Sequence, residues 1–222
     1  MRTMTLSEED YIKAIYHLSS TTNTTVATNA IAEQMETKPS SVTDMIKKLS
    51  EKDLVFYKKY KGVSLTDKGT ACALSIIRKH RLWEVFLVDT LDFSWDEVHD
   101  VAEQLEHIKS EQLIDKLEVF LGSPKVDPHG DPIPSKEGKF ITSVKRLISE
   151  LSVGIVGICV GVNDSSVAFL KFLDKNGIAL GDKMEIVDKE EFDGSVLLKI
   201  KDQELRISSQ IAANLYLEVG EK

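Results

Sequence analysis

The 222-residue chain is poor in cysteine and has no long apolar run, and each shortage excludes a class of protein. Cys72 and Cys159 are the only cysteines, so a disulfide framework and a CxxC metal or redox motif are excluded. No apolar stretch approaches the length that spans a bilayer, and the N-terminal MRTMTLSEEDY lacks the apolar core of a signal peptide. We therefore expect a globular protein of the reducing cytoplasm, with no membrane partner and with both cysteines buried as small hydrophobic residues.

Proline is scarce everywhere except in one segment. Four of the five prolines and three of the twelve glycines fall within residues 122–138, GSPKVDPHGDPIPSKEG. This composition predicts a linker rather than a packed element. Together with the change of character on either side, it predicts three domains, which span residues 1–72, 73–141 and 142–222.

Basic residues are outnumbered in the whole chain, whose formal net charge is −8, but not in its first part. Residues 1–90 carry 13 Lys and Arg against 11 Asp and Glu, whereas residues 91–222 carry 15 against 25. Between Lys38 and Lys61, seven lysines stand against three acidic residues. The overall acidity therefore does not exclude nucleic acid, because a local basic patch remains.

The first 65 residues show the pattern of a winged helix-turn-helix. An N-terminal helix from Ser7 is followed by a short helix over residues 30–35, a TKPSS turn and a helix over residues 42–49. Two strand-like runs, LVFYKKY and GVSLT, then meet around Lys61-Gly62 as a hairpin. Helix, turn, helix and β-ribbon in this order predict a DNA-reading head.

The residues expected to touch DNA lie on the second helix and on the wing. Small hydroxyl residues at the start of that helix let it approach a groove closely, and the wing lysines are placed to neutralise phosphates. A carboxylate among them would accept from a cytosine amino group. The predicted contacts are Lys38, Ser40, Ser41, Thr43, Asp44, Lys47, Lys48, Lys58, Lys59 and Lys61. The alternative is a winged helix that binds protein, with its lysines as a solvated face.

A candidate metal site lies further along the chain. In the run VHDVAEQLEHI, four residues with metal-ligand side chains, His99, Glu103, Glu106 and His107, have the spacing i, i+4, i+7 and i+8. On one helix they would occupy about a quarter of the circumference. Upstream, RKHRLWEVFL adds His80 and Glu84 at i, i+4, in a helix expected over residues 67–87. Buried carboxylates require compensation, so these stripes predict a divalent-metal site between helices.

Beyond the proline-rich segment the pattern becomes β-rich. The runs LSVGIVGICVGV, KMEIVD, SVLLKIK, ELRIS and LYLEV are strand-like, and a helix over residues 165–175 interrupts them. We expect a small five-stranded barrel, because closure removes exposed strand edges. The whole chain is then mainly α with β. Its apolar helices beyond residue 80 predict a homodimer that reads a palindromic site.

These residues resemble the diphtheria-toxin-repressor family of metal-dependent regulators. The motifs PSSVTDMIKKL, RKHRLWEVFLV, VHDVAEQLEHI and PKVDPHGDPIP recur in order, and the LDKNGIALGD turn extends the match to the C-terminal domain. The resemblance is strongest to the three-domain manganese-responsive repressors. It implies a winged helix-turn-helix, a helical metal-binding and dimerisation domain, and an SH3-like (FeoA-like) barrel. It also implies a homodimer that binds double-stranded palindromic operators to control metal-uptake genes, with no catalysis and no small-molecule substrate.

The resemblance implies a primary metal site made by Asp10, Glu103, Glu106 and His107. Iron-type relatives have methionine and cysteine at the positions of Asp10 and Glu103. The hard oxygen donors at both positions favour Mn²⁺, with Fe²⁺ as the alternative. Two-domain manganese regulators carry a glutamate ligand at the position of Lys13, which argues against a binuclear site of their kind.

A second site is implied in two versions. Iron-type relatives use the positions of His80, Glu84 and His99 with two barrel residues, whose counterparts here are Ser165 and Ala168, so that version is incomplete. Streptococcal-type relatives use the position of Glu84 with linker and barrel residues, whose counterparts are Asp127, His129 and Asp164.

Three other interpretations of these residues stay open at this stage. Asp10 could cap its helix, because Ser7 and Asp10 form an S-x-x-D capping pattern. The sequence from Glu103 to His107 resembles the HxxEH helix of a metallohydrolase, but it lacks the first histidine and a separate general base. The C-terminal domain could serve as an adaptor that binds a peptide or another subunit.

Overall fold

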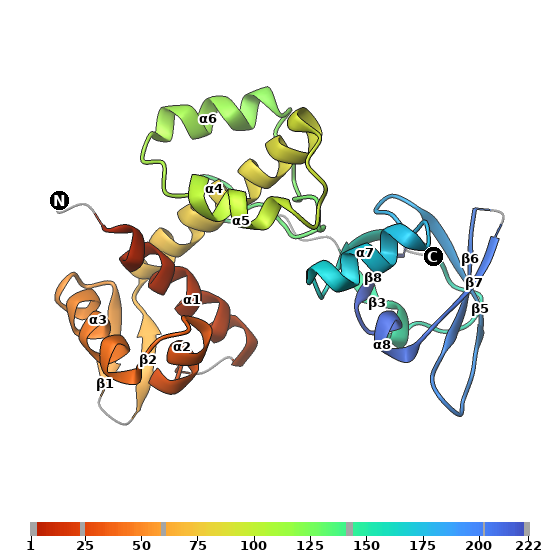
Figure 1. The fold of residues 1–222 in the computed structure, drawn as a ribbon, viewed down its shortest axis with the longest axis horizontal. Coiled ribbons are helices and arrows are strands. Elements are labelled where there is room, and N and C mark those ends of the chain that lie inside the picture. Colours follow the sequence, from red (N-terminus) through yellow and green to blue (C-terminus); the bar gives the residue numbers. More distant parts are fainter. Residues whose placement is uncertain (1–3, 23–24, 59–60, 141–143, 202, 220–222) are drawn as a thin grey trace. The chain divides into compact units, whose positions relative to one another are not determined.

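The computed structural model describes residues 4–22, 25–58, 61–140, 144–201 and 203–219 (Figure 1). The chain divides into two compact units. The first comprises Met1–His80, Glu103–Ile114 and Pro134–Phe140, and the second comprises Arg81–Ala102, Asp115–Ile133 and Ile141–Lys222. None of the helices in these described ranges is both long and apolar enough to cross a membrane.

The first unit begins with the expected winged helix-turn-helix (Figure 1). Its elements are α1 (Leu6–Thr22), α2 (Thr28–Gln34), α3 (Pro39–Glu51), β1 (Val55–Lys58) and β2 (Gly62–Leu65). Apolar side chains at helical spacing, among them Ile12, Ile15, Ile31 and Ile46, meet in one fully buried core. The helix-turn-helix prediction is confirmed, and α3 begins three residues earlier than expected because Pro39 fits the first turn of a helix.

The wing is a two-stranded antiparallel hairpin whose register pairs Lys58 with Gly62. Gly62 has a φ of +93°, and a Cβ at this position would lie 2.8 Å from the carbonyl oxygen of Val26. Only glycine therefore fits where the wing turns back beside Val26, which forms an isolated bridge with Val63. The predicted contact Lys59 lies outside the described residues.

Three further helices follow the wing: α4 (Asp67–Leu91), α5 (Val98–Leu105) and α6 (Glu111–Phe120). α4 runs four residues beyond its predicted end. α5 has only eight residues and ends at Leu105. The prediction that Glu106 and His107 continue this helix was wrong, because both lie in the turn after it.

The second unit contains a six-stranded antiparallel sheet with the order β3-β8-β4-β5-β6-β7. Its strands are β3 (Lys145–Leu147), β4 (Val156–Val162), β5 (Lys183–Lys189), β6 (Val196–Ile200), β7 (Gln203–Ile207) and β8 (Leu215–Glu218). Five of them were expected, and β3 is an additional strand too short to show an alternating pattern. Leu170 and Leu173 of α7 (Val167–Lys175) pack into the core of this sheet, which also includes Cys159. A 3₁₀ turn, Ile148–Glu150, and the short helix α8 (Ser209–Ala212) complete the unit.

The proline-rich segment is packed, so its interpretation as a linker was wrong. Asp127 and His129 are buried, and the backbone N–H of Val162 donates to the His129 carbonyl at 2.9 Å. A Cβ on Gly130 would lie 1.9 Å from the Val160 carbonyl oxygen, at the point where the register of β4 shifts. Residues 127–133 make a compact turn that fits against β4, which composition alone does not distinguish from a flexible connection.

Candidate metal centre

The first turn of α1 is capped by Thr5 and Glu8, which leaves Asp10 for another role. The Thr5 N–H donates to Glu8 Oε2 at 2.8 Å, and the Glu8 N–H donates to Thr5 Oγ1 at 3.3 Å. Burial alone would raise the pKa of Glu8, but hydrogen bonds from Lys52 and Thr5 outweigh it and lower that pKa. The cap is therefore T-x-x-E, and the proposed cap by Ser7 and Asp10 was wrong.

One face of α1 carries Glu9, Asp10 and Lys13 toward the segment that follows α5. His107 lies between the two carboxylates of α1: its Nδ1 is 2.7 Å from Glu9 Oε2, and its Nε2 is 3.1 Å from Asp10 Oδ1. Burial raises the pKa of Asp10, His107 lowers it, and the nearby carboxylates of Glu106 and Glu103 raise it further. The net effect is an upward shift, as expected where negative charges crowd together.

Lys13 occupies the middle of the remaining donors. Its Nζ donates to Glu106 Oε2 at 2.6 Å and to Glu103 Oε1 at 2.7 Å. It also lies 3.3 Å from His80 Nδ1, which is itself 2.7 Å from Glu106 Oε2. The His80 nitrogen can accept from Lys13 or donate to Glu106, according to its tautomer. All of these residues belong to the first unit.

The residues of this centre fit a divalent cation. Asp10, Glu106 and His107 each offer a ligand atom, and these atoms all lie within 4.8 Å of one another. Glu106 is completely buried, and its Oε1 has no hydrogen-bond partner among the described residues. A buried carboxylate oxygen without a partner is costly, so this atom has an unused capacity that a cation would fill. Carboxylate and imidazole donors suit hard or borderline ions.

A second group of donors lies within the second unit. Glu84 on α4 meets Asp127 and His129 of the proline-rich segment, with ligand atoms again within 4.8 Å of one another. His129 Nδ1 is 3.8 Å from Glu84 Oε2, and its Nε2 is 2.8 Å from the Trp95 carbonyl oxygen. His99 joins from the other side, with its Nδ1 3.5 Å from Glu84 Oε1, but its side chain is 59% exposed.

Asp127 is committed to the backbone of its own turn. Its Oδ1 accepts from the N–H groups of His129 and Asp131 at 2.8 and 3.0 Å, and Arg81 Nε lies 3.4 Å from its Oδ2. Burial, and then the charge of Glu84, raise the pKa of Asp127 to about 7, although Arg81 opposes the shift. The predicted ligand Asp164 does not join this group: its Oδ1 accepts from the Ser166 N–H at the start of α7.

Comparisons with known proteins place these features in a family. Residues 3–63 match a model described as the iron dependent repressor N-terminal DNA binding domain. Residues 66–135 match the iron dependent repressor metal binding and dimerisation domain, and residues 146–219 match the FeoA domain. An HTH-type transcriptional regulator of Methanocaldococcus jannaschii is 36% identical over 118 residues, which are 53% of this chain and 94% of that protein.

One of the solved structures similar to the chain is a manganese-dependent transcriptional repressor in complex with manganese. It is 32% identical, has a TM-score of 0.81, and the match covers 96% of this chain and 99% of that one. The chain belongs to the iron-dependent repressor family. The iron-dependent repressor IdeR of Mycobacterium tuberculosis is 34% identical over 126 residues, 57% of this chain and 54% of that protein. Members of this family are metal-dependent transcriptional repressors and not enzymes, so the metallohydrolase interpretation is discarded.

In this member of the family, the DNA contacts predicted at the start of α3 and along it are accessible to solvent. Lys38, Ser40, Ser41, Asp44, Lys47 and Lys48 are exposed, and Thr43 is half-buried. Lys47 Nζ lies 3.3 Å from Asp44 Oδ1, so the charge of this carboxylate is partly offset on the helix itself. Lys58 and Lys61 are exposed on the wing.

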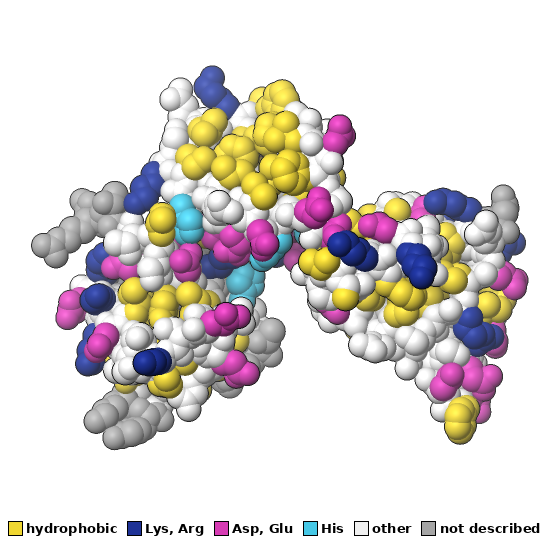
Figure 2. Space-filling model, viewed as in Figure 1, with side chains coloured by type: hydrophobic (Ala, Val, Ile, Leu, Met, Phe, Trp, Pro, Cys, Tyr) yellow, Lys and Arg dark blue, Asp and Glu magenta, His cyan; other side chains and the backbone are white. Residues whose placement is uncertain are grey.

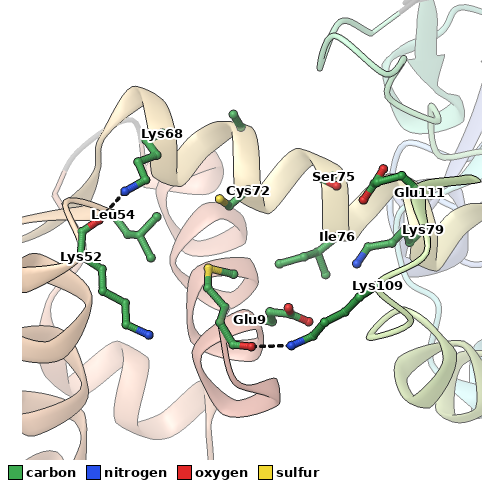
Figure 3. A pocket seen from close by; sticks show the side chains of 12 residues that line it. Glu9, Lys52, Leu54, Lys68, Cys72, Ser75, Ile76, Lys79, Lys109 and Glu111 are labelled. Atoms are coloured by element: carbon green, nitrogen blue, oxygen red, sulfur yellow. Dashed lines mark hydrogen bonds between the residues drawn. The ribbon is translucent and has the colours of Figure 1, made fainter. Parts of the chain in front are cut away.

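Each unit also carries a surface feature of its own. Figure 2 shows hydrophobic side chains gathered over α6, where Val119 and Phe120 are 74% and 68% exposed. A cavity of about 660 Å³ in the first unit has Glu9 and Lys109 in its lining. Figure 3 shows these side chains, and Lys109 Nζ donates to the Met4 carbonyl oxygen at 2.7 Å. Glu9 therefore lines a cavity and contacts His107 at the same time. It was missed as a functional residue because an acidic first turn is ordinary in a helix.

Proposed function

We propose that this repressor is activated by Mn²⁺ bound to Asp10, Glu106 and His107, with Glu103 as the fourth ligand. The observation that carries the proposal is the buried Glu106 Oε1, which has no partner among the described residues although two other donors converge beside it. Glu84, Asp127 and His129, with His99 beside Glu84, are candidates for a second, weaker site. His80, one turn before Glu84 on α4, belongs to the surroundings of the first centre.

The donor chemistry supports Mn²⁺ over Fe²⁺. All the donors in the centre are oxygen or imidazole nitrogen, and neither cysteine belongs to a donor group among the described residues. Hard donors give less advantage to softer ions, which suits Mn²⁺. The similar structure that contains manganese supports the same choice, whereas the mycobacterial relatives are named for iron, so Fe²⁺ is the alternative.

The centre would link α1 to the segment after α5. When bound, the ion supplies positive charge that offsets carboxylates otherwise repelling one another. Glu9 orients the His107 ring, and Asp10 holds the first turns of α1 against Glu106. Since Ile12 and Ile15 of α1 pack in the same core as Ile46 of α3, the position of α1 bears on the DNA-reading helix. Metal and DNA then strengthen each other's binding reciprocally.

We propose further that the protein acts in the cytoplasm as a homodimer on palindromic operators of metal-uptake genes. The exposed apolar residues over α6 support a dimer interface, because a patch of this kind is costly in water. The lysines of α3 and the wing support DNA contact. The two copies would place two reading helices on the two halves of an operator.

The proposal is tested by fluorescence anisotropy with promoter fragments at fixed salt, with chelator, Mn²⁺, anaerobic Fe²⁺ or Zn²⁺. We expect Mn²⁺ to raise operator affinity by about 5- to 150-fold over chelator. A Lys58→Ala control should weaken DNA binding and flatten its salt dependence while leaving metal affinity unchanged. Equal activation by Fe²⁺ would favour the iron alternative, and binding that ignores metal would refute the proposal.

A further inference from the structure

Lys13 Nζ lies among three side chains of metal-ligand type, those of Glu103, Glu106 and His80. Its ammonium contacts two carboxylates and lies beside one imidazole nitrogen, at 2.6, 2.7 and 3.3 Å. We propose that Lys13 is a built-in cation that takes the place of a second ion and limits the centre to one divalent metal. This inference rests on the proposed function, because it presumes that Asp10, Glu106 and His107 bind the first ion.

The groups around Lys13 Nζ are metal-ligand types that converge on one point. Glu103 and Glu106 come from the end of α5 and the turn after it, His80 comes from α4, and each has a donor atom within 3.3 Å of the ammonium nitrogen. Divalent ions bind carboxylate oxygens at roughly 2.0–2.6 Å, slightly inside the distance at which Nζ already lies. An ion and this ammonium therefore exclude each other from the same position.

The charge of the centre explains why a cation is needed there even without metal. Four carboxylates, those of Glu9, Asp10, Glu103 and Glu106, lie together, and Glu106 is completely buried. Lys13 offsets one of these charges at all times. A single divalent ion would offset two more, which leaves little electrostatic reason to bind a second ion.

Lys13 also makes the two carboxylate oxygens of Glu106 different from each other. Its hydrogen bond occupies Oε2, together with His80, while Oε1 keeps no partner among the described residues. Asp10 and Lys13 are three residues apart on α1 and so share one face of that helix. One face of α1 thus presents a ligand to the first ion and a fixed cation in place of the second. Lys13 is a positioning residue for Glu106 as well as a barrier.

The decisive variant is Lys13→Glu, which removes the ammonium and adds a carboxylate beside His80, Glu103 and Glu106. Bound manganese per chain is measured by equilibrium dialysis and elemental analysis of the full chain, with electron paramagnetic resonance of the bound Mn²⁺. We expect one ion more per chain than in the wild type, and a spectrum broadened by exchange between two close ions. An unchanged count overturns the proposal, and the comparison with wild type cancels any ion held near Glu84.

A second variant covers the case in which Lys13→Glu does not fold. Lys13→Gln removes the charge without adding an anionic ligand, so its manganese count should equal that of the wild type. In chelator its melting temperature should fall by roughly 5–10 °C, since it leaves a buried carboxylate uncompensated. Mn²⁺ should restore most of this loss. A wild-type melting temperature in chelator would contradict the role of Lys13 as a compensating cation.

Two controls separate the possible failures. Lys52 pairs with the buried Glu8 at 2.6 Å in the same unit but outside the centre, so Lys52→Gln should lower the melting temperature with and without Mn²⁺. Glu106→Gln should lose one ion. If Glu106→Gln keeps the wild-type count, the proposed centre itself is wrong. If it loses an ion while Lys13→Glu gains none, only the inference about Lys13 fails.

Discussion

Two groups of donors, one in each unit, have almost the same composition and differ in what their atoms already do. Each combines two carboxylates with one histidine and has a basic side chain beside it, Lys13 in the first unit and Arg81 in the second. In the first group Asp10 is 35% exposed, and Glu106 keeps an oxygen without a partner among the described residues. In the second group the side chains of Glu84, Asp127 and His129 are 3%, 3% and 8% exposed.

The difference lies in the partners of the donors. The Asp127 carboxylate accepts from backbone N–H groups of its own turn, and the His129 ring contacts the Trp95 carbonyl oxygen. The Trp95 and His129 rings are stacked, with 6.2 Å between their centroids. The donors of the first group are held mainly by one another and by Lys13. Donors whose atoms are already satisfied by the backbone have less capacity for an ion than donors with an oxygen left unpaired. Two groups of the same composition can therefore differ in how tightly they would bind a metal.

The largest expected difference between the groups is in metal affinity. Glu106→Gln removes a charged ligand, so we expect manganese affinity to fall at least about 100-fold, beyond the loss usual for mutation of a residue that only supports a ligand. Isothermal titration of the full chain measures this. The matched variant Glu84→Gln alters the second group and should change the tighter binding event little. Equal losses in both variants would show that the two groups do not differ as argued.

The second difference is in stability. Asp127→Ala removes the acceptor for two backbone N–H groups and the partner of Arg81, so we expect the free energy of unfolding in chelator to fall by about 3–5 kcal/mol. Urea denaturation followed by circular dichroism measures it. Asp193 accepts from the Ser195 N–H in a similar turn but is itself exposed, so Asp193→Ala should cost much less. An Asp127 variant as stable as the Asp193 variant would remove the structural role of the second group.

Much of this architecture was predictable from local patterns in the sequence. Apolar spacing predicts α1 to α4, and the hairpin around Gly62 follows from strand-like runs on either side of a turn signal. The spacing of one motif indicated Glu106 and His107, and Asp10 was implied by the family resemblance alone. The structure brings the three side chains together, but Glu106 and His107 lie in the turn after α5 and not on the single helix that the spacing argument assumed. Their role as metal ligands stays a prediction.

The failures share one cause, which is that they depend on packing between distant segments. The sequence offers two capping registers, Thr5 with Glu8 and Ser7 with Asp10, and only the position of α1 decides between them. The contacts of Glu9 and Lys13 depend on the packing of α1 against the segment after α5, which local sequence patterns do not predict. Likewise, the packing of the proline-rich turn depends on the fit of Gly130 against Val160, some thirty residues away along the chain.

The smallest expected effect tests whether Glu9, which contacts a proposed ligand without being one, contributes to metal binding in the first group. Glu9 Oε2 lies 2.7 Å from His107 Nδ1, on the side of the ring opposite the nitrogen that faces Asp10. A carboxylate in this position fixes the ring and increases the basicity of the other nitrogen, so Glu9→Gln should weaken manganese binding by about 10-fold. Glu111 is exposed and lines the same cavity as Glu9, the one drawn in Figure 3. Glu111→Gln should therefore leave manganese binding unchanged. Titration calorimetry compares the two. If the two variants bind manganese with the same affinity, the contact between Glu9 and His107 does not contribute to metal binding.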